Sequence, residues 1–208
     1  MIAKVFIAIP TRDLIHAHTA YCLQETVRYC ENRDIQTTVS FNMGTLICNQ
    51  REALTKEFLE SDSTHIMWID SDMMFPANIV ETLLSHSLPV VACSYSTRGL
   101  PLKSVSYTDL TDWESWIDSA TEPLISVQAT GMGMMLVEKE VLVPMSSPRF
   151  EIKWMGEDHL GEDFDHCLKI TELGYSIVID TKASAEILHI GSHAFSFKAL
   201  KNTNISAV

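Results

Sequence analysis

The sequence predicts an α/β fold with a mostly parallel central sheet and a smaller antiparallel sheet beside it. Over about the first hundred residues, short apolar runs alternate with segments whose apolar residues recur at helical spacing. Beyond about residue 101, the apolar segments become shorter and are interrupted by polar residues. The first pattern is typical of βαβ units with right-handed crossovers, and the second is typical of antiparallel strands.

Strand and helix signals alternate in order through the first half of the chain. Continuous apolar or β-branched runs predict strands at residues 5–9, 35–40, 65–69 and 89–93. Apolar residues at helical spacing predict helices at residues 14–31, at residues 49–60 and after Pro76. The carboxyl ends of parallel strands meet at one edge of the sheet, where open α/β sheets bind their ligands.

The second half is expected to add short strands and one clear helix. Its strand signals lie at residues 125–128, 132–137, 175–179 and 186–190. A helix is predicted over about residues 162–173, with Gly174 in the position that ends it. The methionines Met132, Met134 and Met135 are expected to fill the core.

Length and composition indicate one globular domain over residues 1–208. The chain has 208 residues, of which 46% are hydrophobic and 20% are charged, and no linker or repeat divides it. Its formal net charge of −12 repels the phosphates of nucleic acid and of anionic lipid, so neither is an expected partner. A phosphate-bearing ligand would therefore need a metal ion or a local basic cluster. The oligomeric state is not predicted.

The cysteines and the apolar stretches indicate a cytoplasmic protein. The five cysteines are widely spaced and form no Cys-x-x-Cys pair, so we expect reduced residues in the core. The first residues do not have the pattern of a signal peptide. No apolar stretch approaches the ~20 residues that a membrane span needs.

Two carboxylates follow directly after the expected strand at residues 65–69. In an extended chain, residues two positions apart point to the same side, so Asp70 and Asp72 can converge on one site. Their hard oxygens suit Mg²⁺ or Mn²⁺, which can in turn hold a diphosphate. The alternative is a polar turn in which an aspartate caps the next helix.

A second acidic group lies where the helix at 162–173 is expected to begin. Glu162 and Asp163 follow Gly161, and an earlier copy of the same three residue types stands at 156–158. Acids in a first helical turn complement the helix dipole, which is the structural explanation. In a cleft beside a metal, one of them would be a natural general base.

A histidine follows two apolar residues in the last expected strand. His189 precedes Ile190 and Gly191, and its imidazole could bind a metal. A single histidine in such a strand is more often a hydrogen-bonded core residue, so both interpretations stay open.

Taken together, these segments resemble the GT-A type glycosyltransferases, and family 2 in particular. Asp70-Ser71-Asp72 resembles their DxD motif, and Gly161-Glu162-Asp163 resembles the start of their catalytic helix. His189-Ile190-Gly191 is similar to their C-terminal metal-binding segment. The segments at 7–12 and 130–134 look like the strand and turn that hold the nucleotide and the strand that lines the acceptor side. The resemblance spans about residues 4–195.

The resemblance implies a Rossmann-like sandwich, with a nucleotide-binding part at about residues 1–100 and an acceptor part at about 101–198. It implies a metal-dependent hexosyltransferase that uses a UDP- or GDP-linked sugar and an acceptor hydroxyl on a carbohydrate or another molecule. Asp163 would be the base of an inverting reaction, and Glu162 would support it. Mn²⁺ or Mg²⁺ would be held by Asp70, Asp72 and His189. The donor would contact Pro10, Thr11, Arg12, Asn49, Arg51, Asp70 and Ser71.

Two other functions stay open at this point. A sugar-phosphate nucleotidyltransferase would use a similar sheet and a metal, but it should carry a glycine-rich basic loop after the first strand, where this chain has Pro10-Thr11-Arg12-Asp13. A binding protein without turnover is the other alternative.

Several side chains away from these segments have more than one interpretation. Trp154 could stack on a sugar or cover the core. Arg98 and Lys103 are expected to be solvated charges, with pairing to phosphates as the alternative. Residues 103–122, which contain Trp113 and Trp116, are interpreted as a surface hairpin, with an acceptor-binding flap as the alternative.

Overall fold

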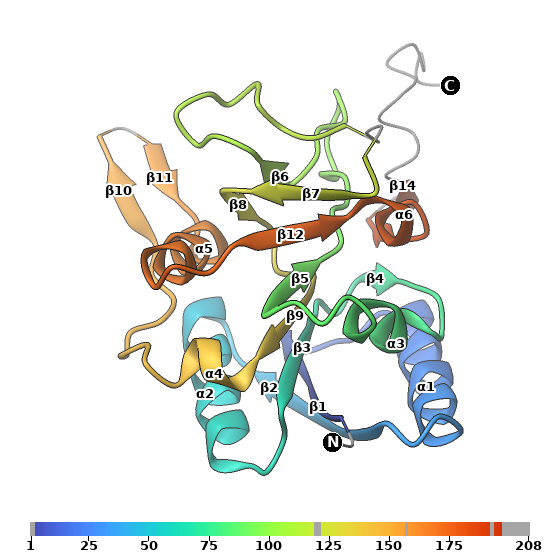
Figure 1. The fold of residues 1–208 in the computed structure, drawn as a ribbon. Helices are drawn as coiled ribbons and strands as arrows, with labels where there is room; N and C mark the ends of the chain where they lie inside the picture. The colour runs from blue at the N-terminus through green and yellow to red at the C-terminus, as the bar shows by residue number, and fades with distance from the viewer. Residues whose placement is uncertain (1–2, 119–121, 157, 192–193, 197–208) are drawn as a thin grey trace.

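A seven-stranded sheet forms the centre of the molecule (Figure 1). The computed structural model describes residues 3–118, 122–156, 158–191 and 194–196. The strand order is β2-β1-β3-β9-β5-β12-β7. The strands are β1 (Lys4–Thr11), β2 (Gln36–Met43), β3 (His65–Ile69), β5 (Val90–Ala92), β7 (Leu124–Val127), β9 (Met134–Glu138) and β12 (Ile177–Asp180). All run in one direction except β7 and β9, so the predicted mostly parallel sheet is confirmed.

The position of β9 differs from the prediction. Its run was expected among antiparallel strands on the acceptor side, but β9 lies within the central sheet and pairs antiparallel with both β3 and β5. Met134, Met135, Leu136 and Val137 are all buried, with exposed fractions of 2% or less. A strand in the middle of a covered sheet must be apolar on both faces, and this run meets that requirement.

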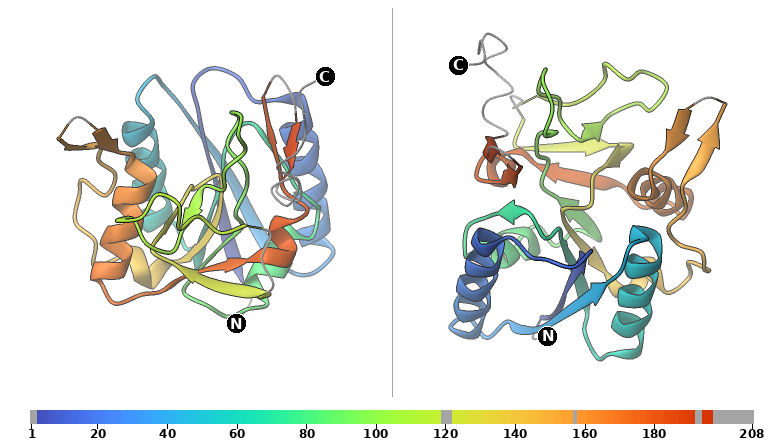
Figure 2. Two further views of the ribbon diagram at one scale, coloured as in Figure 1. Left: turned by 90° about the horizontal axis from the view of Figure 1, so that it is seen from above. Right: turned by 180° about the vertical axis from the view of Figure 1, so that it is seen from behind.

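Helices cover both faces of the sheet (Figures 1 and 2). Apolar residues of α2, α4 and α5 join one core cluster, and those of α1, α3 and α6 join the other. The longer helices α1, α2 and α5 each bury one side and leave residues of the opposite side exposed, as their apolar spacing predicts. The helices are α1 (Ala17–Glu31), α2 (Ile47–Glu60), α3 (Ile79–Leu84), α4 (Lys139–Leu142), α5 (Glu162–Glu172) and α6 (Thr181–Ser184).

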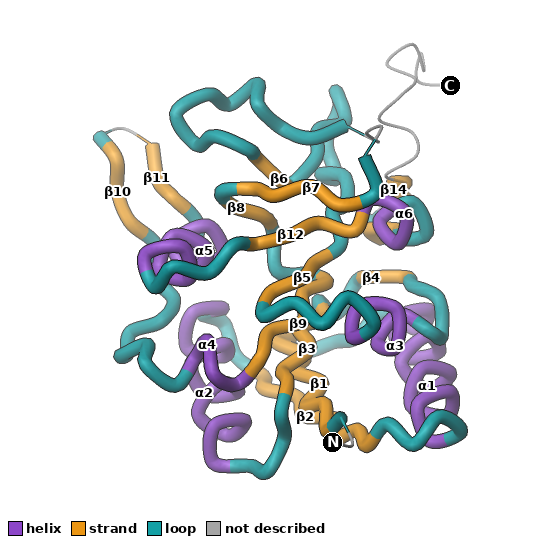
Figure 3. The backbone as a smooth tube through the Cα atoms, viewed as in Figure 1, coloured by secondary structure: helices purple, strands orange, loops and turns teal. Residues whose placement is uncertain are grey.

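Three small antiparallel sheets surround the central one (Figure 3). The first is a hairpin of β10 and β11, and the second pairs β6 with β8. The third has the order β14-β13-β4. Their strands are β4 (Met73–Met74), β6 (Ser106–Tyr107), β8 (Ala129–Thr130), β10 (Lys153–Met155), β11 (Asp158–Leu160), β13 (Leu188–Ile190) and β14 (Ala194–Ser196).

The segment at 103–122 is more than the surface hairpin that was expected. Ser104, Ser106 and Ile117 are buried, and β6 pairs with β8 across more than twenty residues of sequence. The buried hydroxyls of Ser104 and Ser106 both hydrogen-bond to that of Ser94, and Ser106 Oγ also lies 2.6 Å from Thr130 Oγ1. Buried polar groups are stable in this form because each has a partner.

Several side-chain expectations can now be compared with the structure. Met132, Met134 and Met135 are buried, as predicted. Trp154 is 74% exposed on the β10–β11 hairpin, so it does not cover the core. All five cysteines are free. Among the described residues, the helices are all too short or too polar for a membrane crossing.

Candidate functional site

A polar cavity of about 330 Å³ opens at the carboxyl edge of the central sheet. The loops that follow β1, β2 and β3 contribute to its wall, as do the start of α5 and strand β13. Such edges collect ligand-binding residues because the loops there converge while the strands stay rigid. The lining residues are Pro10, Thr11, Arg12, Gly44, Thr45, Ile47, Gln50, Arg51, Asp70, Ser71, Asp72, Arg98, Glu162, Asp163 and His189.

Asp70 stands directly after the last residue of β3. Its N–H donates to the carbonyl oxygen of Gly133 at 3.1 Å, which fixes the backbone at the end of the strand. Its Oδ1 lies 3.2 Å from Nη2 of Arg51. Burial raises the pKa of Asp70, although the Arg51 charge opposes that shift. Arg51 therefore favours the ionised form of Asp70, against the effect of burial.

Asp72 and His189 are brought together by the pairing of β4 with β13. The N–H of Ile190 donates to the Asp72 carbonyl oxygen at 2.7 Å, and His189 stands opposite Met73 in the register. His189 Nε2 lies 3.6 Å from Asp72 Oδ2. His189 Nδ1 donates to the carbonyl oxygen of Ser96 at 2.9 Å. This bond fixes the ring and directs Nε2 toward Asp72. His189 is therefore hydrogen-bonded, as a core histidine would be, and its role as a metal ligand stays a prediction.

Arg98 is an ion-pair partner inside the site and not the solvated charge that was expected. Its Nη1 lies 2.6 Å from Asp72 Oδ2, although half of the arginine side chain is exposed. Burial works against ionisation of Asp72, but the hydrogen bond to His189 and the charges of His189 and Arg98 lower its pKa overall. The sequence singled out Arg98 but did not predict this ion pair, because 26 residues separate Arg98 from Asp72. Lys103 is a surface charge, as expected, and pairs with the exposed Glu114 at 3.0 Å.

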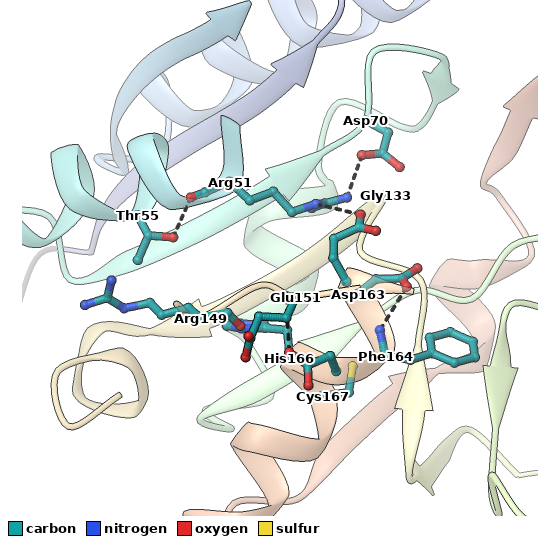
Figure 4. Close-up of polar contacts among 12 residues, drawn as sticks. Arg51, Thr55, Asp70, Gly133, Arg149, Glu151, Asp163, Phe164, His166 and Cys167 are labelled. Atoms are coloured by element: carbon teal, nitrogen blue, oxygen red, sulfur yellow. Dashed lines mark hydrogen bonds and ion pairs between the residues drawn. The ribbon is translucent and has the colours of Figure 1, made fainter. Parts of the chain in front are cut away.

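Arg51 is a buried cation at the cavity wall, and Figure 4 shows its side chain extending toward Asp70. It is 3% exposed and extends from α2 toward Asp70, while its Nε lies 3.5 Å from Glu162 Oε1. Its guanidinium also lies 5.4 Å from the ring centroid of Trp68. A buried charge is tolerated only when it is paired, and two carboxylates from different elements pair with this one. Arg51 therefore links the end of β3 to the start of α5.

Asp163 occupies the first turn of α5 and lines the cavity. Burial and the neighbouring Glu162 charge raise its pKa to about 7, and Arg51 partly opposes the shift. Its Oδ1 accepts a hydrogen bond of 2.8 Å from the Phe164 N–H. A carboxyl group whose pKa lies near neutrality can both take and return a proton at physiological pH.

The two copies of Gly-Glu-Asp have different structures. The later copy begins α5 over Glu162–Glu172, which confirms the predicted helix at about 162–173. In the earlier copy, Gly156 has φ +73° in the turn of the β10–β11 hairpin, a conformation that glycine adopts readily. Asp158 belongs to β11, and Glu157 lies outside the described residues.

Tyr95 and two glycines pack behind the acids of the cavity. The Tyr95 hydroxyl accepts a hydrogen bond of 2.9 Å from the Gly133 N–H, and its ring meets His189 edge-on at 5.1 Å. A Cβ on Gly133 would lie 2.7 Å from that hydroxyl and 2.9 Å from Asp70 Oδ2. A Cβ on Gly131 would lie 2.5 Å from the same hydroxyl. The glycines leave room for Tyr95, which the sequence analysis did not single out.

Most of the residues that were expected to bind the donor line the cavity, but Asn49 does not. Pro10, Thr11, Arg12 and Ser71 line the cavity with the acids. Asn49 is exposed and does not line the cavity, so its expected contact with a donor stays a prediction. Its neighbours on α2 line the cavity instead, because a helix turns about 100° per residue. Gln50 lines the cavity and donates to the Gly44 carbonyl oxygen at 2.7 Å.

The side chains of Asp72 and His189 are suited to a divalent cation whose remaining ligands are phosphate oxygens and waters. Within the described ranges, no three histidine, cysteine or acidic side chains are arranged as a closed metal site. Asp72 and His189 provide a carboxylate oxygen and an imidazole nitrogen 3.6 Å apart. Mg²⁺ in phosphate-binding enzymes is commonly held by one or two protein carboxylates, with phosphates and waters completing its shell. Arg98 would have to leave Asp72 for such an ion to bind.

Comparison with known proteins supports the fold. No protein-family model and no curated protein matches the sequence. The structure is similar to the crystal structure of A197 from STIV, with a TM-score of 0.60 and 19% identity over 91% of this chain and 86% of that one. A glycosyltransferase involved in glycosylation of the major capsid of PBCV-1 matches 70% of this chain and 68% of that one, at 13% identity. Its TM-score of 0.35 is too low to bear on function. The chain therefore shares a mixed α/β fold with A197 from STIV.

Proposed function

We propose that the protein is a metal-dependent glycosyltransferase that transfers a sugar from a nucleotide-diphosphate sugar to an acceptor hydroxyl with inversion. The observation that carries the proposal is one cavity, at the carboxyl edge of a mostly parallel sheet, that contains both Asp72 with His189 and the half-buried Asp163. The first pair suits a cation that holds a diphosphate, and the third residue suits a general base. Sugar transfer from a nucleotide donor requires both functions.

In this proposal, one group of residues stabilises the leaving group and another activates the nucleophile. Asp72 and His189, with Asp70 behind them, would hold Mn²⁺ or Mg²⁺, and the bound ion would neutralise charge on the departing nucleoside diphosphate. Arg98 and Arg12 stand at the same wall and would contact the phosphates once Asp72 no longer holds Arg98.

On the other side of the cavity, Asp163 would remove the proton from the acceptor hydroxyl. The oxygen would then attack the anomeric carbon from the face opposite the diphosphate, and the configuration there would invert. Glu162, held by Arg51, keeps negative charge beside Asp163 and helps to keep its pKa near 7. Pro10, Thr11 and Ser71 line the cavity beside these groups, where the nucleoside would lie.

The test is nucleotide binding measured by calorimetry with and without Mn²⁺, using UDP and GDP. We expect Mn²⁺ to strengthen binding of one of them, and we expect Asp72→Asn to abolish that gain while leaving the melting temperature near the native value. Asp62→Asn is the matched control, because Asp62 is an exposed aspartate whose partner is Lys4. If Asp72→Asn bound the nucleotide with unchanged Mn²⁺ dependence, the proposal would be wrong.

His189→Ala separates a ligand from a purely structural histidine. We expect the affinity for Mn²⁺ to fall more than the melting temperature does, because Nε2 faces Asp72 and Nδ1 is used only for orientation. A large loss of stability with unchanged Mn²⁺ affinity would assign His189 to the structure alone.

A further inference from the structure

Three aromatic rings from two distant segments form a platform beside the candidate active site. Trp113 lies nearly parallel to Phe164, with an interplanar angle of 17° and centroids 6.4 Å apart. Tyr107 meets Trp113 edge-on at 5.4 Å and Phe164 at 5.6 Å. Tyr107 is 9% exposed, whereas Trp113 is 49% exposed. We call these three residues the aromatic platform, and Trp113 is its accessible part.

The loop that carries Trp113 is held in one conformation by its own hydrogen bonds. Ser115 Oγ donates to the Asp109 carbonyl oxygen at 2.6 Å and accepts from the Asp109 N–H at 3.0 Å. The Thr108 N–H donates to the Ser115 carbonyl oxygen at 3.2 Å, and the Leu110 N–H donates to Gln128 Oε1 at 2.5 Å. The exposed indole is therefore already ordered, which lowers the entropic cost of binding a ligand to it.

The platform adjoins the candidate base. Phe164 follows Asp163 in α5, and its N–H donates to the Asp163 carboxylate. Figure 4 shows the Phe164 ring and the Asp163 carboxylate on the same side of the helix start. A ring-shaped ligand resting on Trp113 would thus lie beside the carboxyl group whose pKa is raised to about 7.

We infer that the aromatic platform is the acceptor subsite and that its ligand is a neutral pyranose ring stacked on Trp113, an inference that rests on the proposed function. The C–H groups on one face of a pyranose pack against an aromatic face, while its hydroxyls point outward in the plane of the ring. One such hydroxyl would face Asp163. Other acceptor hydroxyls, such as that of a serine in a peptide, have no ring face that would use the platform.

The acidic side chains of the loop favour a neutral pyranose over an anionic one. Asp109, Asp112 and Glu114 surround Trp113 in sequence, and of these acids Glu114 is paired with Lys103 at 3.0 Å, which leaves the two aspartates as the uncompensated charges nearest in sequence to Trp113. Carboxylates accept hydrogen bonds from sugar hydroxyls but repel a carboxylate on the ligand. A uronic acid should therefore bind more weakly than the matching neutral sugar.

Saturation-transfer difference NMR on the full chain tests this inference without any donor. The probes are methyl β-D-glucopyranoside, methyl β-D-galactopyranoside, methyl α-D-mannopyranoside and methyl β-D-glucuronide. We expect at least one neutral probe to receive saturation on the protons of one ring face, and the glucuronide to receive less than the glucoside. Trp113→Ala should weaken binding of that probe about tenfold. Trp113→Phe should restore part of the loss, and Trp154→Ala should bind like the native chain.

The outcomes separate this inference from the proposed function. If the native chain binds no neutral probe, or if folded Trp113→Ala binds as well as the native chain, the platform is not a sugar subsite. Nucleotide binding under those conditions would leave a glycosyltransferase with another acceptor, such as a peptide hydroxyl. Sugar binding that depends on Trp113, without any UDP or GDP binding, would support the sugar subsite. It would contradict the proposed glycosyltransferase function.

Discussion

At the scale of single residues, Asp163 combines a raised pKa with a place in the cavity wall. A base acts in the chemical step, so its removal should reduce turnover much more than donor binding. We predict that Asp163→Asn lowers sugar transfer by roughly 100- to 10,000-fold while nucleotide affinity stays near the native value. Steady-state kinetics and calorimetry on the same preparation measure the two effects.

The matched control for this variant is Asp158→Asn in the earlier Gly-Glu-Asp copy. Asp158 belongs to the β10–β11 hairpin and not to the start of α5, so we expect transfer near the native rate. If Asp158→Asn were the inactive variant and Asp163→Asn were active, the base would have to be assigned to the hairpin. If both were active, a retaining reaction would explain the site better.

The pKa of Asp163 also predicts how activity and stability depend on pH. The native carboxyl group has a pKa of about 7, against a usual value of 3.8, so between these values the folded state holds a proton that the unfolded state has lost. The contribution of Asp163 to stability therefore falls as pH rises from about 4 to about 7. Transfer should increase over the same upper range, as the base becomes ionised.

Asp163→Asn should remove this dependence on pH. We expect the melting temperature of Asp163→Asn, minus that of the native chain, to increase from pH 4 to pH 7. Above pH 7 this difference should stay constant. Thermal denaturation at pH 4, 5.5, 7 and 8.5 measures this, and an unchanged difference across the series would contradict the raised pKa.

Arg51 is the residue whose loss should cost the most stability. It is buried and paired with both Asp70 and Glu162, so Arg51→Met would leave two carboxylates without their cation. Breaking a buried pair in this way typically costs about 3–5 kcal/mol. Urea denaturation measures the loss, with Arg28→Met as control because Arg28 is 65% exposed in its pair with Glu25. Equal, small losses in both variants would show that Arg51 is not a structural cation.

At the scale of elements, the turn between β8 and β9 sets the positions of Tyr95 and Asp70. Gly133→Ala would bring a methyl group within 2.7 Å of the Tyr95 hydroxyl and 2.9 Å of Asp70 Oδ2, so both side chains would have to move. We predict that Mn²⁺-dependent nucleotide binding falls at least tenfold. Gly99→Ala is the control, since its Cβ would meet nothing within 4 Å. Native-like binding by Gly133→Ala would mean that the wall can adjust without moving the acids.

At the scale of the whole molecule, β9 joins the two halves of the chain into one sheet. In the described part of the chain, β3 pairs with β1 and β9, and β5 pairs with β9 and β12. A chain of residues 1–103 would lose both β9 and β12 and would expose the buried face of β3, including Trp68. We predict that it shows no cooperative urea transition and that residues 104–208, added in trans, restore one. Cooperative unfolding of residues 1–103 alone would contradict this.

The sequence alone was sufficient for the elements whose pattern is local. The strand at 65–69 matches β3, and the helix expected at 162–173 matches α5 to within one residue, because a continuous apolar run and an acidic helix start depend on neighbouring residues. The same local signals placed Asp70, Asp72 and Asp163 at ends of elements. Asn49 lies outside the cavity lining while Gln50 and Arg51 belong to it, because each step along a helix turns the side chain by about 100°.

What the sequence determined by itself is therefore the α/β class, the order of elements and the acidic residues at their ends. Only the tertiary structure decided that β9 inserts between β3 and β5, that Arg98 reaches Asp72, that Arg51 joins Asp70 to Glu162, and that Trp113 stacks on Phe164 beside Asp163. Each of these depends on segments far apart in the chain. Local propensity and periodicity report on neighbours within a few residues, whereas such contacts arise from packing and charge pairing that exist only once the sheet has formed.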